Sequence, residues 1–247
     1  MDKTSNPKGV LNANYSANRS KKKELFFRYR VRATAVIEAF QRHCADSNSI
    51  RLLDLGAADG KTLAFMAMAL PVSEAIGIEY NQNLIDCADE LLASQNHTKL
   101  VCGDVTNLAD LTDCSFDLVS ALALLEHIQY PAKVVAEAAR VLKPGGLFVA
   151  TSPVPFWDHV AVKTGFLKED HHECDMHPAK FRDFITAQHS LELIEYQPFM
   201  FAPVGVLPYL GIQPSPATSL RIDRGFSSLG LFNWLFVNQM VVARKIS

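Results

Sequence analysis

The 247-residue sequence lacks several features that would place it in a class at once. It has no run of about 18 consecutive apolar residues, so no transmembrane helix is predicted. The first residues, MDKTSNPKGV, hold no apolar stretch of the kind that secretion signals contain, and we expect no signal peptide. The five cysteines are odd in number and include no CxxC pair, which predicts reduced thiols and a cytoplasmic protein.

A strong net charge is absent as well. The formal net charge is −2, which gives no overall attraction to nucleic acid or to an anionic membrane. The charge is nevertheless uneven, because residues 1–32 carry nine lysines and arginines against two acids. This basic stretch is either a solvated helix face or a contact for an anionic partner: an acidic substrate, a phospholipid surface or RNA.

Apolar periodicity predicts strands that alternate with helices, and this pattern is typical of βαβ units in a parallel sheet. The crossover rule places helices on both faces of such a sheet. No internal repeat or low-complexity segment is present. The expected helices are 21–43, 61–70, 82–94, 131–142 and 179–189; the expected strands are 50–55, 74–80, 98–104, 115–122, 147–153, 191–199 and 233–245, with a turn at 143–146.

The most informative segment is LLDLGAADGKT, residues 52–62, a buried strand followed by a turn of small residues and a helix start. In a doubly wound sheet, ligands bind beyond the carboxyl ends of the strands. Gly56 permits a tight turn, and Gly60 permits close backbone approach at the helix start. The Gly-x-Ala-x-Gly spacing, with Ala58 in the middle, differs from the dinucleotide fingerprint GxGxxG.

Acidic residues end the next two predicted strands. Glu79 stands 25 residues after Asp54, where a carboxylate can accept hydrogen bonds from the two hydroxyls of a ribose. Asp104 ends the third strand in VCGDV, in a position to meet an adenine amino group. Acids at three successive strand ends predict a nucleoside pocket.

The motifs LDLGAADG, IGIEYN, VCGDVTNL, SFDLVSALALLEHI and VLKPGGLFVATSP follow one another in order. Over about residues 50–153 they resemble class I S-adenosylmethionine-dependent methyltransferases, in particular the small-molecule, methyltransferase type 11 or ubiquinone-biosynthesis-like branch. The resemblance implies an α/β fold: a Rossmann-like, doubly wound, seven-stranded, mostly parallel sheet with helices on both faces, an antiparallel last strand and an N-terminal helical extension. It also implies S-adenosyl-L-methionine as cofactor.

The resemblance assigns roles to residues of the predicted pocket. The glycine loop would hold the methionine portion, Glu79 the ribose and Asp104 the adenine, while Asp54 would help to orient the amino group. Ala58 replaces the middle glycine of the family and would be strained by about 1 kcal/mol if its φ is positive. The complete expected cofactor set is Asp54, Gly56, Ala58, Gly60, Glu79, Tyr80, Asp104, Val105, Ala121 and Leu122.

The resemblance also divides the chain. Residues 1–20 are expected to be a flexible N-terminal segment and residues 21–247 a single methyltransferase domain. Within that domain we expect an N-terminal helix in 21–48, the cofactor-binding half in 50–153, a lid in 154–180 and an apolar insertion between the last two strands in 199–230.

Three histidines are candidates for contact with the acceptor. His127 lies in LLEHI; ubiquinone-biosynthesis O-methyltransferases carry Glu-x-x-Glu-His there and hold a divalent cation. Ala123 replaces the first of those glutamates, so no metal is predicted. The stretch HHECDMH, residues 171–177, looks like a zinc site on paper. We expect instead that it belongs to the lid, with His172 or His177 touching the acceptor; a local hydrogen bond or a helix cap is the structural alternative for each histidine.

The expected acceptor is a small or medium-sized, partly apolar molecule, methylated on O, N or C. Nucleic acid is not expected, because the Asn/Asp-Pro-Pro-aromatic run and the Pro-Cys pair of base methyltransferases are both missing. The apolar stretch FMFAPVGVLPYLGI is a substrate pocket, a homodimer interface or a peripheral membrane contact. The alternative function is a non-catalytic methyltransferase-fold protein that acts as a binding or regulatory module.

Overall fold

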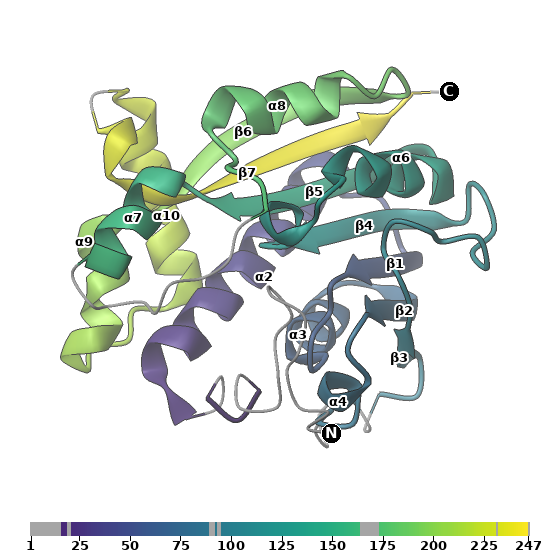
Figure 1. Ribbon diagram of the computed structural model, residues 1–247, viewed down its shortest axis with the longest axis horizontal. Helices are drawn as coiled ribbons and strands as arrows, with labels where there is room; N and C mark the ends of the chain where they lie inside the picture. Colours follow the sequence, from purple (N-terminus) through teal and green to yellow (C-terminus); the bar gives the residue numbers. More distant parts are fainter. Residues whose placement is uncertain are drawn as a thin grey trace, which may run out of the picture.

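The computed structural model describes residues 16–18, 21–88, 92, 95–163, 173–230 and 232–246. Its centre is one seven-stranded sheet with the order β3-β2-β1-β4-β5-β7-β6 (Figure 1). Only β7 runs antiparallel to its neighbours. The predicted fold class is therefore confirmed. The strands are β1 Ile50–Leu55, β2 Val72–Glu79, β3 Thr98–Cys102, β4 Phe116–Leu122, β5 Leu142–Pro153, β6 Leu191–Phe201 and β7 Phe236–Lys245.

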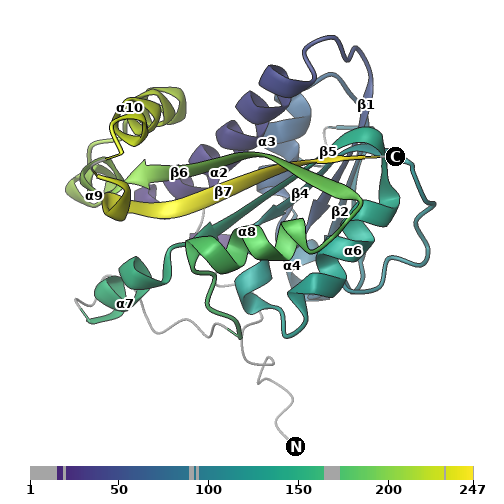
Figure 2. The same cartoon turned by 90° about the horizontal axis from the view of Figure 1, so that it is seen from above.

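Helices cover both faces of the sheet (Figure 2). α2 (Lys23–His43), α3 (Lys61–Ala69) and α10 (Pro216–Ser228) pack on one face, whereas α6 (Pro131–Val141) and α8 (Pro178–Thr186) pack on the other. Because successive side chains of a strand point to opposite faces, Leu52 joins the first core and Leu53 the second. Burial on both faces explains why the central strands are nearly continuous apolar runs.

Two elements differ from the sequence-based expectation. The turn at 143–146 lies inside β5 and not before it, because Phe116 pairs with Leu142 and Leu118 with Leu147. The four residues between them bulge out of the ladder, with Gly145 at φ +81°. The helix expected over 82–94 is only the short α4, Gln82–Ile85, followed by a turn; residues 89–91 and 93–94 lie outside the described part.

The proline-rich connection between β6 and β7 is helical. It contains α9 (Ala202–Val206), the 3-10 helix η2 (Leu207–Leu210), α10 and the 3-10 helix η3 (Asn233–Leu235). Pro203, Pro208 and Pro216 stand in the first turns of the first three, where a missing N–H costs nothing. The expected lid region likewise begins with a helix, α7 (Pro155–Lys163), and its residues 164–172 lie outside the described part.

Asp223 fastens this insertion to the sheet. Its buried carboxylate accepts hydrogen bonds from the backbone N–H of Met200 (2.7 Å) and of Phe201 (2.9 Å), at the end of β6. The backbone that it holds at the end of β6 is strained, since Met200 has φ +60°. Burial raises the pKa of Asp223 to about 6, even though both hydrogen bonds favour the ionised form.

The raised pKa of Asp223 predicts a pH-dependent stability. The folded state holds the proton more tightly than the unfolded chain, so the contribution is largest near pH 4 and is lost as pH rises through 6. From pH 5 to 7.5 the free energy of unfolding should fall by about 1 kcal/mol more in the wild type than in Asp223→Asn. Urea titrations at both pH values measure this difference, and parallel pH profiles for the two proteins would contradict it.

Candidate active site

The carboxyl ends of β1, β2 and β4 meet at one edge of the sheet, because these strands are parallel and in register. The glycine loop leaves this edge after β1. The backbone N–H groups of Gly56 and Ala57 both donate to Ile78 O, at 2.9 and 3.0 Å. Gly56 has φ +71°, and a Cβ there would lie 2.7 Å from Leu124 Cδ1, so only glycine fits. The loop therefore presents backbone groups to a ligand at this edge.

Ala58, the departure from the family pattern, has a positive φ of 51°. A left-handed alanine costs about 1 kcal/mol. The carboxylate of Glu79 offsets that cost, since its Oε2 accepts the N–H of Ala58 at 2.9 Å while Oε1 accepts the N–H of Asn81 at 2.9 Å. Each carboxylate oxygen has a second lone pair, which leaves Glu79 able to accept ribose hydroxyls as well.

Asp54 lies beside these hydrogen bonds of Glu79 but within strand β1 of the sheet. It is 2% exposed, and its Oδ1 accepts a hydrogen bond from Ser120 Oγ at 2.6 Å. The two residues are register partners on β1 and β4. No sequence pattern had selected Ser120, because only the pairing of the two strands brings it to Asp54.

A second buried group under the loop was missed by the sequence reasoning. Asp59 Oδ2 accepts hydrogen bonds from Lys61 Nζ at 2.9 Å and from Ser16 Oγ at 2.7 Å. All three residues are buried. The Asp-x-Lys spacing was visible in the loop, whereas Ser16 is 43 residues away from Asp59 and carried no signal. A helical turn at 16–18 thus contacts the loop that is expected to hold the cofactor.

The remaining expected cofactor residues divide into exposed and buried positions. Asp104 is exposed, and its Oδ1 accepts the N–H and the hydroxyl of Thr106, each at 2.8 Å. Tyr80 is 64% exposed. Val105 and Ala121 have their side chains in the core and can meet a ligand only through their backbone, while Leu122 is half-buried; Gly60, at φ +76°, begins α3.

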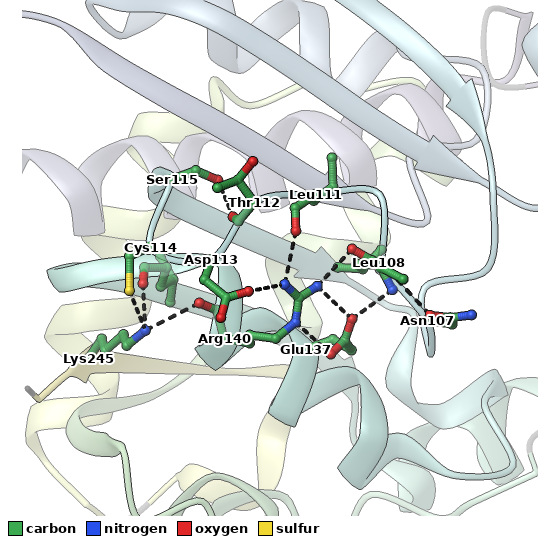
Figure 3. A network of polar contacts seen from close by, with 12 residues as sticks. Asn107, Leu108, Leu111, Thr112, Asp113, Cys114, Ser115, Glu137, Arg140 and Lys245 are labelled. Atoms are coloured by element: carbon green, nitrogen blue, oxygen red, sulfur yellow. Dashed lines mark hydrogen bonds and ion pairs between the residues drawn. The ribbon is translucent and has the colours of Figure 1, made fainter.

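A polar network holds the connection that leads away from Asp104 (Figure 3). Arg140 of α6 pairs with Glu137 through Nε and Nη2, both at 2.9 Å, and with Asp113. It also donates to Leu111 O at 2.9 Å and to Leu108 O at 2.7 Å. Hydrogen bonding to Arg140 lowers the pKa of Glu137. One guanidinium therefore anchors a segment without regular structure at several points.

The structure brings two of the candidate histidine segments together. His127 ends the 3-10 helix η1 (Leu125–His127), and the preceding Glu126 accepts at its backbone oxygen the N–H of Glu173 (2.9 Å) and of Cys174 (3.1 Å). His177 follows shortly and is the exposed N-cap residue of α8, with no side-chain cap hydrogen bond. The described end of HHECDMH thus docks beside His127 at the carboxyl edge.

The structure describes only part of HHECDMH, the stretch that looked like a zinc site in the sequence. His171 and His172 lie outside the described residues. Among the residues that are described, no group of three or more His, Cys, Asp or Glu side chains is arranged to hold a metal ion. The five cysteines are free thiols, as expected.

Known proteins match the chain in sequence and in fold. Residues 53–150 match the family described as "Methyltransferase domain". The chain is 28% identical over 209 residues to the thiol S-methyltransferase TMT1B of Rattus norvegicus, which covers 77% of each chain. It is 33% identical over 109 residues to the demethylmenaquinone methyltransferase of Clavibacter sepedonicus, covering 42% of this chain and 43% of that one. The plantazolicin methyltransferase BpumL in complex with SAH superposes with a TM-score of 0.65 at 14% identity, over 95% of this chain and 90% of that chain.

The matched domain and these relatives support an S-adenosylmethionine-dependent methyltransferase of the class I kind. Its cofactor is S-adenosylmethionine, and the donor set fits that group: two carboxylates at strand ends and a loop that offers backbone groups. In the described part of the methyltransferase, no helix is long and apolar enough to cross a membrane.

Arg140 supplies a stability test. Arg140→Gln should lower the free energy of unfolding of the methyltransferase by about 2–3 kcal/mol, because Glu137 loses its charged partner and two backbone oxygens lose a donor. Arg140→Lys keeps the charge but not the fork of donors, and should recover less than half of that loss. Chemical denaturation measures both variants. Equal stability of Arg140→Lys and the wild type would show that charge alone matters here.

Proposed function

We propose that this methyltransferase binds its cofactor with Glu79 on the ribose, Asp104 on the adenine and the Gly56–Gly60 loop on the methionine portion. The observation that carries the proposal is the double hydrogen bond of Glu79 to Ala58 N–H and Asn81 N–H. These bonds hold the carboxylate at the carboxyl end of β2 before any ligand arrives. Such preorganisation lowers the entropic cost of binding.

The protein contributes to the reaction mainly by positioning the methyl donor and the acceptor. The cofactor supplies a methyl group on a sulfonium, whose departure leaves a neutral thioether. No negative charge develops on the leaving group, so holding donor and acceptor in line provides much of the rate. In this proposal Asp54 helps to orient the amino group of the methionine portion, and Tyr80, Val105, Ala121 and Leu122 line the pocket.

We propose an acceptor that is small or medium-sized and partly apolar, methylated on O, N, C or S. Sulfur enters because the relative from Rattus norvegicus is named a thiol S-methyltransferase. A thiol with a pKa of about 8.5 is partly ionised at neutral pH and needs little help from a base. An alcohol would need one. His127, His172 and His177 are the proposed contacts on the acceptor side.

A cytoplasmic location completes this proposal. Five free cysteines suit a reducing compartment.

Calorimetry with S-adenosylmethionine and S-adenosylhomocysteine tests the cofactor site. Asp104→Ala should weaken binding by roughly ten- to a hundredfold, as expected for a hydrogen bond to a charged group. Glu79→Ala should weaken it at least as much, because the loop also loses an acceptor for Ala58 N–H. Asp110→Ala removes an exposed acid of the same connection and is the matched control. Unchanged affinity in Asp104→Ala and Glu79→Ala would show that the pocket lies elsewhere.

An acceptor screen that measures S-adenosylhomocysteine release tests the chemistry. An alkyl thiol, an alcohol, an amine and a quinol of similar apolar bulk serve as probes. Base assistance predicts that His127→Asn or His177→Asn lowers kcat for an alcohol acceptor by about 10²-fold or more, with a much smaller effect for a thiol. Equal losses for both probes would assign these histidines to the structure and not to proton transfer.

A further inference from the structure

Exposed apolar side chains gather at one end of the molecule. Of the fourteen large apolar residues that are exposed in the described part, nine lie between residues 156 and 234. They belong to α7, to α9, to η2 and the second residue after it, and to the segment from the end of α10 to η3. Figures 1 and 2 both place α7, α9 and α10 at the same end. The nine are Phe156, Val162, Val206, Tyr209, Leu210, Ile212, Leu229, Phe232 and Trp234.

This end continues the carboxyl edge of the sheet. Pro153, the last residue of β5, pairs with Asn238 near the start of β7, and Phe201, the last residue of β6, pairs with Phe236. The helices that follow β5 and β6 therefore begin at the edge where Gly56 and Glu79 lie. The apolar end is on the same side of the sheet as the candidate active site.

Two lysines border this end. Lys21 and Lys23, at the start of α2, line a cavity of about 210 Å³ together with Phe26 and Gln213. Gln213 follows directly on Ile212, which places both lysines beside the exposed apolar tip formed by Tyr209, Leu210 and Ile212. η2 itself packs against α2.

Acidic side chains do not balance these lysines from the insertion. Between residues 199 and 235 the sequence holds a single acid, Asp223, which is buried and bonded to the end of β6. The same stretch holds two arginines, Arg221 and Arg224. Arg224 pairs with Glu38 of α2, whereas Arg221 is exposed. The surface of the insertion is thus apolar and basic.

We propose that this end, which we call the docking face, binds the surface of an anionic phospholipid bilayer. Leu210, Ile212 and Trp234 enter the interface between headgroups and acyl chains, and Lys21 and Lys23 contact lipid phosphates. Exposed apolar tips bordered by lysines are the combination that interfacial membrane binding uses. Docking in this way turns the carboxyl edge toward the lipid.

A second copy of the chain fits the docking face less well. A two-fold dimer would place the face against itself and bring Lys21 and Lys23 of both copies together. An acceptor pocket fits less well too, because Leu210 is 70% exposed. The charge complementarity with lipid phosphate therefore decides among the three occupants.

Vesicle sedimentation of the full chain tests the proposal and needs neither cofactor nor acceptor. The protein should bind vesicles of phosphatidylcholine with about one-third phosphatidylglycerol, and at least about tenfold more weakly to phosphatidylcholine alone or in about 0.5 M salt. Leu210→Asp/Ile212→Asp should weaken binding to anionic vesicles by at least about tenfold. Lys21→Gln/Lys23→Gln should weaken it by about tenfold.

Matched control variants lie at the opposite edge of the sheet. Met68, near the end of α3, is 65% exposed, and Lys99, near the start of β3, is exposed and pairs with Glu74. Met68→Asp and Lys99→Gln should bind vesicles like the wild type. Since all substituted residues are exposed, every variant should keep the wild-type unfolding temperature. Equal losses in the control variants would overturn the proposal.

Fluorescence gives a second readout from the docking face. The chain has two tryptophans, and Trp157→Phe leaves Trp234, which is 64% exposed, as the only one. Its emission should shift to shorter wavelength with anionic vesicles and stay unchanged with phosphatidylcholine vesicles. Absence of vesicle binding overturns the proposal. So does a concentration-dependent dimer that Leu210→Asp/Ile212→Asp dissociates, because the face would then be a subunit interface.

Discussion

The hydrogen bonds of the Glu79 carboxylate hold together the loop after β1 and the start of α4, where we propose that the cofactor binds. One oxygen accepts the N–H of Ala58 in the loop after β1, and the other accepts the N–H of Asn81 at the start of α4. The contact with Ala58 requires β1 and β2 to be adjacent, parallel and in register, as the pairing of Leu55 with Ile78 shows. A slip of one residue would turn the carboxylate to the other face of the sheet.

The same carboxylate explains why alanine is tolerated in the glycine loop. The left-handed backbone at Ala58 costs about 1 kcal/mol. A hydrogen bond to a charged, nearly buried acceptor returns about 1.5–3 kcal/mol, so the balance favours the observed loop. At Gly56 no such compensation is open, because a Cβ would collide with Leu124. Ala58 therefore meets a constraint of backbone conformation, whereas Gly56, at φ +71°, meets constraints of backbone conformation and of space together.

The local sequence pattern was enough to predict the buried strands and the loop after β1. Continuous apolar runs marked the buried strands, and the small residues after β1 marked the loop. The helices α7, α9 and α10 were not predicted, because residues 154–180 show no clear period and residues 199–230 carry prolines amid apolar residues. In α9 and α10 proline stands in the first turn, where it suits a helix. Ser16 and Ser120 were missed for another reason: their partners Asp59 and Asp54 are 43 and 66 residues away. Contacts at such separations follow from strand order and leave no trace in spacing.

The basic stretch at 21–23 and the apolar insertion at 199–230 each allowed several functional interpretations in the sequence, and the two lie together in the fold. Taken alone, the lysines at 21–23 suit a solvated helix face, and the apolar insertion suits a pocket, a dimer or a membrane. A shallow pocket lined by Lys21, Lys23, Phe26 and Gln213 places these lysines next to the insertion, so the two stretches can be interpreted together. A purely solvated face would not need an apolar tip beside it, and a self-associating face would bring the lysines of both copies together. The two stretches lie about 190 residues apart in sequence, and their contact in the fold favours a single interpretation for both. They meet at the edge of the sheet where we propose that the acceptor binds.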